Sequence, residues 1–219
     1  VARGGEQIGF LVPVEFLRQL LARREDARWQ ALGMEERIAE ALLADQEQYF
    51  AGLLDGPWET QSFGGFRVPG RISAALRCWG GSSDRPGLRY EHSAQECGSQ
   101  DAIYIDETLQ TGELRYEFHR FASRELNTAQ FYGLLAGNYR HGEHYNASDR
   151  EHVGNFRCRE DFVRGSGIDW RVSFCARRYQ RYAGLFDLSV AMASTDLLQR
   201  GLVVRLGVDG ISEKRAREL

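Results

Sequence analysis

Apolar residues recur with the spacing of an α-helix in two stretches near the start of the chain. The first stripe consists of Phe16, Leu17, Leu20 and Leu21. It predicts a helix over residues 14–24, and a longer stripe of the same period predicts a second helix over residues 34–54. Acidic residues cover the other side of the second helix, as expected for a face in contact with water. Residues 14–57 are therefore predicted to form a helical linker.

After residue 57 the pattern changes to short runs in which apolar and polar residues alternate, separated by turns that contain Gly or Pro. Alternation of this kind is typical of half-buried β-strands. The predicted strands cover residues 72–79, 102–105, 114–121, 168–175, 184–193 and 202–208. Asn127-Thr128 is a suitable cap for one further helix, and Ser212-Glu213 opens another. We therefore expect an α+β fold, in which an N-terminal helical segment precedes a mainly antiparallel, sandwich-like β-rich domain over residues 58–219.

All four cysteines of the chain lie in this predicted β-rich domain. Local pairing of Cys78 with Cys97 and of Cys158 with Cys175 is the simplest connectivity, because each pair brackets a turn-rich stretch between predicted strands. Reduced cysteines buried in the core are the alternative. A four-cysteine zinc site is disfavoured, since it needs cysteines spaced two to four residues apart. Disulfides would indicate an oxidising compartment, either the periplasm or the cell exterior.

The order of cysteine, turn and strand is similar in residues 78–121 and residues 158–193. This similarity predicts that the β-rich domain has two similar halves.

Size and charge narrow the choice of function. The chain has 219 residues, of which 42% are hydrophobic, so it can bury a core without metals or other staples. Acidic residues outnumber basic ones by 31 to 28, and we therefore expect no nucleic-acid partner. No apolar run reaches the length of a membrane span, so none is expected. Because the chain begins at Val1 and ends inside a predicted helix, we expect a fragment of a longer protein.

The first thirteen residues carry a recognisable motif. Gly4-Gly5 suits a turn, and it is followed by the apolar run Ile8-Gly9-Phe10-Leu11-Val12-Pro13. This segment resembles the closing strand of HtrA/Deg-type trypsin-like serine proteases, with Leu-Val in place of the family's usual Ala-Ile. The resemblance implies that residues 1–13 are the last strand of a protease barrel. It also implies that Gly5, Ile8 and Gly9 lie near the substrate.

The resemblance also implies that the catalytic residues lie upstream of this chain, because the family's Ser, His and Asp all precede the closing strand. The nearest approach to a nucleophile motif, Gly165-Ser166-Gly167, indicates a turn. We therefore expect a non-catalytic C-terminal fragment of a bacterial trypsin-like serine endopeptidase, periplasmic or secreted, without a cofactor. Its β-rich domain would recognise a protein or peptide substrate or a partner. The alternative is a free-standing β-sandwich binding module of the cell envelope, with a peptide or carbohydrate ligand.

Two further groups of residues have side chains that suit a binding site. His141, His144, Asp149 and His152 have a spacing that suits a metal, but their polar surroundings favour a solvated surface loop, so no metal is expected. If five of the aromatic side chains are exposed, they could stack on sugars or bind peptide side chains. We expect instead that most of them are buried in the core. These aromatics are Trp58, Trp79, Trp170, Tyr179 and Tyr182. The basic and aromatic stretch over residues 177–182 is predicted to be a solvated strand edge.

Overall fold

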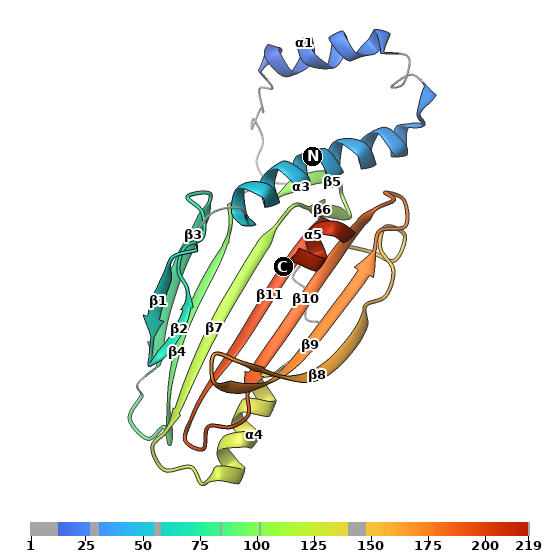
Figure 1. The fold of residues 1–219 in the computed structure, drawn as a ribbon. Coiled ribbons are helices and arrows are strands. Elements are labelled where there is room, and N and C mark those ends of the chain that lie inside the picture. The colour runs from blue at the N-terminus through green and yellow to red at the C-terminus, as the bar shows by residue number, and fades with distance from the viewer. Residues whose placement is uncertain are drawn as a thin grey trace.

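A computed structural model describes residues 13–26, 31–54, 58–83, 85–100, 102–139 and 148–218 of the chain. Its centre is a seven-stranded antiparallel sheet with the strand order β3-β4-β7-β11-β10-β9-β8 (Figure 1). The strands are β3 (Leu76–Ser83), β4 (Tyr90–Ser99), β7 (Leu114–Ser123), β8 (Arg157–Gly165), β9 (Ile168–Arg178), β10 (Leu185–Ser194) and β11 (Arg200–Ser212). The expected fold class, helices followed by a mainly antiparallel β-rich region, is confirmed.

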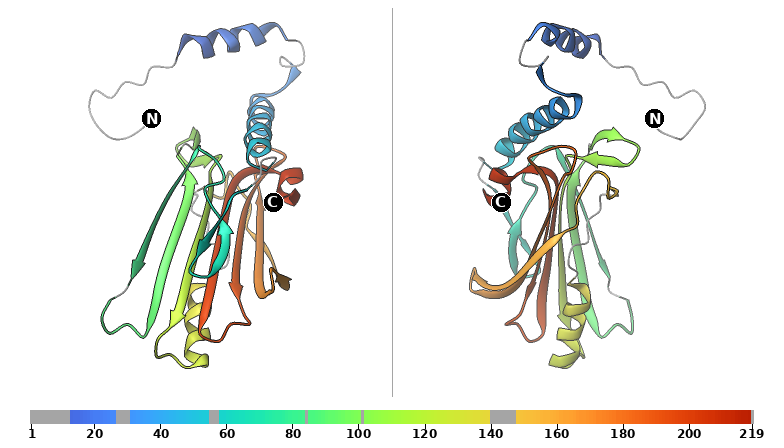
Figure 2. Two further views of the ribbon diagram at one scale, coloured as in Figure 1. Left: turned by 60° about the vertical axis from the view of Figure 1, so that its left-hand side comes forward. Right: turned by 90° about the vertical axis from the view of Figure 1, so that its right-hand side faces the viewer.

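Two small hairpins accompany this sheet. β1 (Thr60–Phe63) and β2 (Phe66–Pro69) are joined by Gly64 and Gly65, whose positive φ angles of 57° and 88° suit a tight two-residue turn. This hairpin lies over one face of the main sheet, which gives a sandwich-like arrangement, and β8 curls toward the same side (Figure 2). We call this side the hairpin face. β5 (Ile103–Asp106) and β6 (Leu109–Thr111) form the second hairpin at the upper end of the sheet.

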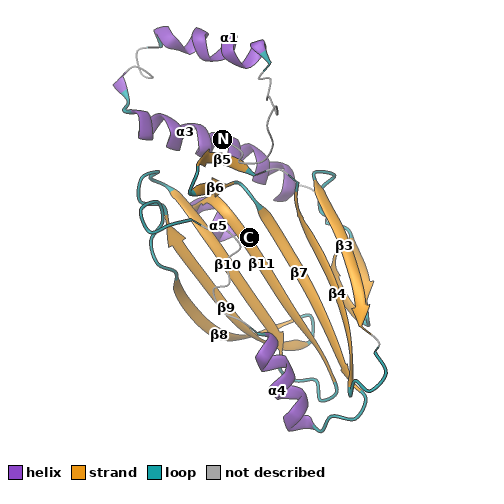
Figure 3. Cartoon of the chain, turned by 180° about the vertical axis from the view of Figure 1, so that it is seen from behind, coloured by secondary structure: helices purple, strands orange, loops and turns teal. Residues whose placement is uncertain are grey.

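The helices lie around the sheet. α1 (Val14–Ala22) and the short 3-10 helix η1 (Arg23–Glu25) match the first predicted helix, and α3 (Met34–Leu54) matches the second. α3 crosses the upper end of the sheet, whereas α4 (Thr128–Asn138) lies on the opposite side from the β1–β2 hairpin, which we call the α4 face (Figure 3). α5 (Glu213–Glu218) follows β11 directly. None of the helices in the described ranges is long and apolar enough to cross a membrane.

Alternation along the central strands divides the core between the two faces. On β7, Tyr116 and Phe118 belong to the main apolar cluster of the hairpin face, whereas Phe121 belongs to the cluster beneath α4. Phe50 and Leu53 of α3 are buried in the cluster of the hairpin face. The helical segment and the sheet therefore share a core, while the division of the chain into domains stays a prediction.

Disulfides join each edge strand of the main sheet to its neighbour. Cys78 on β3 is bonded to its register partner Cys97 on β4, and Cys158 on β8 is bonded to its register partner Cys175 on β9. This is the local pairing that the sequence favours. Three strands with one such disulfide flank β11 on each side, and the interpretation as two similar halves stays a prediction.

Candidate functional site

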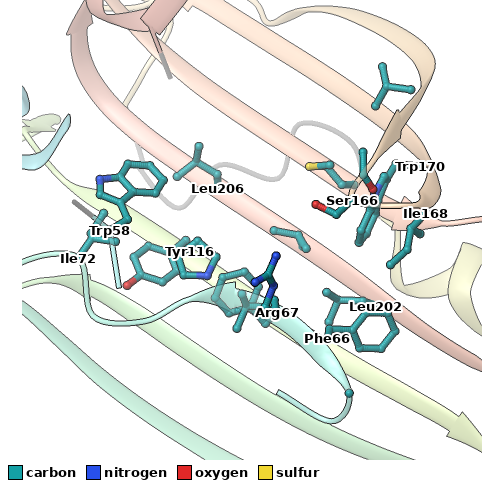
Figure 4. Close-up of a pocket in the computed structure, with 18 of the residues that line it drawn as sticks. Trp58, Phe66, Arg67, Ile72, Tyr116, Ser166, Ile168, Trp170, Leu202 and Leu206 are labelled. Atoms are coloured by element: carbon teal, nitrogen blue, oxygen red, sulfur yellow. The ribbon is translucent and has the colours of Figure 1, made fainter. Parts of the chain in front are cut away.

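A pocket of about 650 Å³ opens on the hairpin face (Figure 4). It lies between the β1–β2 hairpin on one side and the β8–β9 turn on the other, over the middle strands of the sheet. Its volume is in the range of small-molecule binding sites, which are typically about 300–1,000 Å³. The pocket is therefore large enough for a ligand and is the candidate functional site of this chain.

The floor of the pocket follows from the alternation of β11. Leu202, Val204 and Leu206 point to the hairpin face and line the pocket. Val203 points the other way and is completely buried in the cluster beneath α4. The same strand thus covers the α4 face with one set of apolar residues and offers a second set to the pocket. Tyr116 and Phe118 of β7 extend this floor.

Three aromatic side chains in the pocket wall use their polar atoms within the protein. The indole N–H of Trp58 donates to the carbonyl of Leu53 at 2.7 Å, and that of Trp170 donates to the carbonyl of Gly165 at 3.2 Å. The hydroxyl of Tyr116 donates to the backbone carbonyl of Gly70 at 2.5 Å, and burial raises the pKa of Tyr116. These rings therefore present apolar surface to the pocket, because their hydrogen-bonding groups already have partners.

Two polar side chains also line the pocket. Arg67 is the one charged residue among the described lining residues, and it comes from the middle of β2. Ser166 comes from the β8–β9 turn, where its φ of 52° and the positive φ of Gly167 produce a tight turn. The prediction of a turn at this place is confirmed. A nucleophile at Ser166 would need a neighbouring base, and no such base lines the pocket in the described part of the chain.

The α4 face carries a separate group of polar side chains. The rings of His92 and His119 stack in parallel, with a nitrogen–nitrogen distance of 3.2 Å. His119 also contacts the carboxylate of Glu117 at 3.0 Å, and Glu117 is paired with Arg205 at 3.2 Å. Arg205 in turn donates to the carbonyl of Asn138 at the end of α4. This group holds α4 against the sheet, which is a structural role.

The predicted histidine cluster is brought together only in part. His141 and His144 lie outside the described residues. His152 is 3% exposed, so the expectation of a solvated loop is wrong at this position. Its ring contacts the hydroxyl of Thr108 at 2.9 Å and the carboxylate of Asp106 at 3.4 Å, because the β5–β6 hairpin packs over it. No group of three or more metal-binding side chains is found within the described ranges.

The basic and aromatic stretch after β9 differs from its prediction. Arg177 forms an ion pair of 2.7 Å with Asp187, which is completely buried. Tyr179 is also buried and shares a hydrogen bond of 2.7 Å with Thr111, and burial raises its pKa strongly. The prediction of a solvated edge is wrong at Arg177 and Tyr179, because β9 is an inner strand of the sheet, between β10 and β8. Arg178, Gln180 and Arg181 of the same stretch are exposed, as predicted.

The other aromatics divide between core and surface. Trp170 and Tyr182 are buried in the core, as predicted. Trp58 and Trp79 are instead 41% and 47% exposed. Trp58 and Trp170 line the pocket, and Trp79 does not.

The predicted substrate-binding residues Gly5, Ile8 and Gly9 lie outside the described residues. The fold and the pocket define this protein as one with a seven-stranded antiparallel sheet, whose edge strand β8 curls toward the β1–β2 hairpin, and with an apolar cavity on the same face. No protein-family model, curated protein or solved structure matches the chain. The protease relationship therefore stays a prediction.

The sequence pattern placed several of the pocket-lining residues in strands, but it did not predict the pocket. Tyr116, Phe118 and Leu202 to Leu206 were in predicted strands, but the residues of β2 were not. The available signal was the Gly64-Gly65 pair between two short alternating runs, which is typical of a hairpin. Nothing local to that hairpin indicated which face of which sheet it would cover.

Proposed function

We propose that this chain is a non-catalytic binding protein that holds one apolar ligand chain in the pocket of the hairpin face. The observation that carries the proposal is a pocket of about 650 Å³ whose described lining is apolar except for Arg67 and Ser166. Burial of apolar surface is the main favourable contribution that such a site offers to binding. The ligand is therefore expected to be a hydrocarbon chain or a molecule of similar character.

The pocket fits an apolar chain better than a carbohydrate. A sugar brings many hydroxyl groups, and burying these groups without hydrogen-bond partners is costly. The N–H and O–H groups of Trp58, Tyr116 and Trp170 already donate to backbone carbonyls, so they are not available as donors to sugar hydroxyls. Of the two ligand classes expected for a free-standing module, a carbohydrate is thus disfavoured. A peptide would have to bind here through an apolar side chain.

The volume supports a single chain. At roughly 30 Å³ for each heavy atom, the share of a water molecule in the liquid, a pocket of about 650 Å³ accommodates roughly 20 heavy atoms. This is the size of one long acyl chain with its head group, and it is well below that of a two-chain phospholipid.

The disulfides support an extracytoplasmic location for this function. Cys78–Cys97 and Cys158–Cys175 are typical of proteins from oxidising compartments, and we propose the periplasm or the cell exterior. In a parent protein with a trypsin-like protease domain, the pocket would serve recognition of a substrate or a partner.

A series of n-alkanols tests the proposed function. Trp58 and Trp170 line the pocket, so their fluorescence reports on its occupancy. Each additional buried methylene contributes about 0.8 kcal/mol, so affinity is expected to rise about fourfold for each added carbon until the pocket is full. The measurement is titration of the purified, disulfide-bonded chain with alkanols of increasing length, followed by tryptophan fluorescence and calorimetry.

Two substitutions to phenylalanine serve as test and control. Val204→Phe fills the middle of the pocket and is expected to abolish binding, while Leu198→Phe, at a site 62% exposed and outside the pocket, is expected to leave it unchanged. Circular dichroism checks that both variants fold. Absence of binding in the unsubstituted chain, or equal binding by the Val204→Phe variant, would refute the proposed function.

A further inference from the structure

One side chain of the pocket has a charge that its described surroundings leave unbalanced. Arg67 lies on β2 between Phe66 and Val68, which are both buried against the main sheet. Strand alternation therefore places Arg67 on the outer side of the hairpin, where it is exposed. Its guanidinium nevertheless turns into the pocket (Figure 4). Within the described residues it has no ion-pair or hydrogen-bond partner.

Ser166 faces the same space from the other wall. It lies on the β8–β9 turn, and its hydroxyl points into the pocket from the side opposite to Arg67 (Figure 4). Ser166, too, has no hydrogen-bond partner among the described side chains and backbone groups. A cation and a hydroxyl donor, both on exposed residues, thus line a pocket that is otherwise apolar.

The other charged side chains described near the hairpin do not neutralise the positive charge of Arg67 at the pocket. Arg120, on the same face of the sheet, is paired with Glu91 at 3.2 Å, and Glu91 also contacts Arg124 at 3.5 Å. The guanidinium of Arg200 lies 5.9 Å above the ring of Phe66, so a second cation is close to the hairpin. No carboxylate is among the described lining residues of the pocket.

We propose that the ligand is a single-chain amphiphile with a carboxylate head, in which the chain fills the pocket and the carboxylate pairs with Arg67 and accepts a hydrogen bond from Ser166. This inference rests on the proposed function and adds the chemical class of the ligand. A guanidinium presents two parallel N–H donors that match the two oxygens of a carboxylate. The head group lies beside the exposed residues Arg67 and Ser166, where water also reaches it, so that no charge is buried without a partner.

The experiment compares head groups on one chain length. Dodecanoate and dodecanol have the same hydrocarbon chain, and both are titrated at neutral pH below their aggregation concentrations. Exposed ion pairs contribute little, whereas a bidentate pair beside apolar surface contributes more, so the acid is expected to bind about tenfold more tightly than the alcohol. Arg67→Gln is expected to remove this preference while alcohol binding is retained. Arg67→Lys keeps the charge without the fork and is expected to retain part of the preference.

Matched controls separate the side chain from general charge effects. Arg77→Gln removes an exposed arginine from β3 that does not line the pocket, and it is expected to leave the preference unchanged. Arg200→Gln is expected to reduce the preference less than Arg67→Gln does. A preference that survives in the Arg67→Gln variant and disappears in the Arg200→Gln variant would overturn the assignment to Arg67.

The outcomes distinguish this inference from the proposed function. Equal binding of acid and alcohol by the unsubstituted chain would overturn the carboxylate inference and leave the apolar pocket standing. Binding of neither would overturn both. A third probe, dodecyl phosphate, tests the head group itself, because tighter binding of the phosphate than of dodecanoate would overturn the choice of a carboxylate.

Discussion

At the scale of single residues, the fold contains charged and titratable groups whose roles depend on burial. Asp187 is completely buried, and it accepts both from Arg177 at 2.7 Å and from the backbone N–H of Gly210 at 3.1 Å. Removing one member of such a pair is costly, because the other charge then remains buried without a partner. Asp187 and Arg177 therefore stabilise the fold, and neither of them lines the pocket.

His92 makes stability depend on pH. Burial first and the neighbouring His119 second lower the pKa of His92 from its ordinary value near 6.5. Below that value the unfolded chain therefore binds more protons at this residue than the folded chain does. The contribution of neutral His92 to the free energy of unfolding is fully present above about pH 6.5. It is lost as the pH falls through the lowered pKa of His92 in the folded state.

The variant His92→Phe tests this dependence. Phenylalanine keeps an aromatic ring beside Phe121, whose ring centroid lies 4.7 Å from that of His92, but it does not titrate. Urea unfolding is measured at about pH 7.5 and about pH 5.5 for both proteins, and the decrease in stability is expected to be smaller in the variant. An equal decrease in both proteins would assign the pH dependence to other groups.

At the scale of elements, the contact between α4 and β11 depends on one glycine. A Cβ atom at Gly201 would lie 2.7 Å from the side chain of Leu135, which is 2% exposed and has little room to move. Gly207 is on the same strand and the same face, yet a Cβ there would meet nothing within 4 Å. The two glycines therefore form a matched pair.

We expect Gly201→Ala to destabilise the protein by about 1–3 kcal/mol, because it forces α4 away from the sheet. Gly207→Ala is expected to be neutral or to stabilise by less than about 1 kcal/mol, since alanine loses less conformational freedom in a strand. Urea unfolding of both variants measures the difference. Similar values for the two would show that α4 is not tightly packed at Gly201.

The burial of a strand in the sheet determines whether its sequence pattern predicts it. β10 and β11 are central in the sheet, and their apolar alternation predicted them. β8 is an edge strand whose residues are nearly all exposed, and β4 is only partly buried, so neither has the apolar pattern that predicts a strand. Pairing with a neighbour, fixed in both cases by a disulfide, makes them strands.

At the scale of the whole molecule, α3 and the main sheet share one core. Phe50 is completely buried among residues of the hairpin face. Phe50→Ala is therefore expected to lower the free energy of unfolding of the whole chain by about 3–5 kcal/mol, with a single cooperative transition. Urea unfolding followed by both circular dichroism and tryptophan fluorescence measures this effect.

The control is Met34→Ala at the start of the same helix, where the side chain is 66% exposed. A surface substitution of this kind is expected to change stability by less than about 0.5 kcal/mol. If Phe50→Ala has an equally small effect, residues 34–54 act as an independent linker, as the predicted division of the chain has it.

The amino-acid sequence was sufficient for the features that depend on near neighbours. Apolar periodicity predicted α3 with its observed bounds, and Asn127 caps α4 as expected by accepting from the N–H of Gln130. Alternation predicted the strand β7, and the spacing of the cysteines favoured the pairs that the structure contains. These features follow from helical and strand geometry within a few residues or across one turn.

The pocket depended on contacts between residues far apart in the chain. Phe66 and Arg67 meet Leu202 and Trp170 only because the β1–β2 hairpin folds over the sheet and β8 curls toward it. The burial of Arg177 likewise required β10 to bring Asp187 alongside β9. Local periodicity shows which side chains share a face, but the partner of that face is set by the order and curvature of the strands, which arise from packing of the whole sheet.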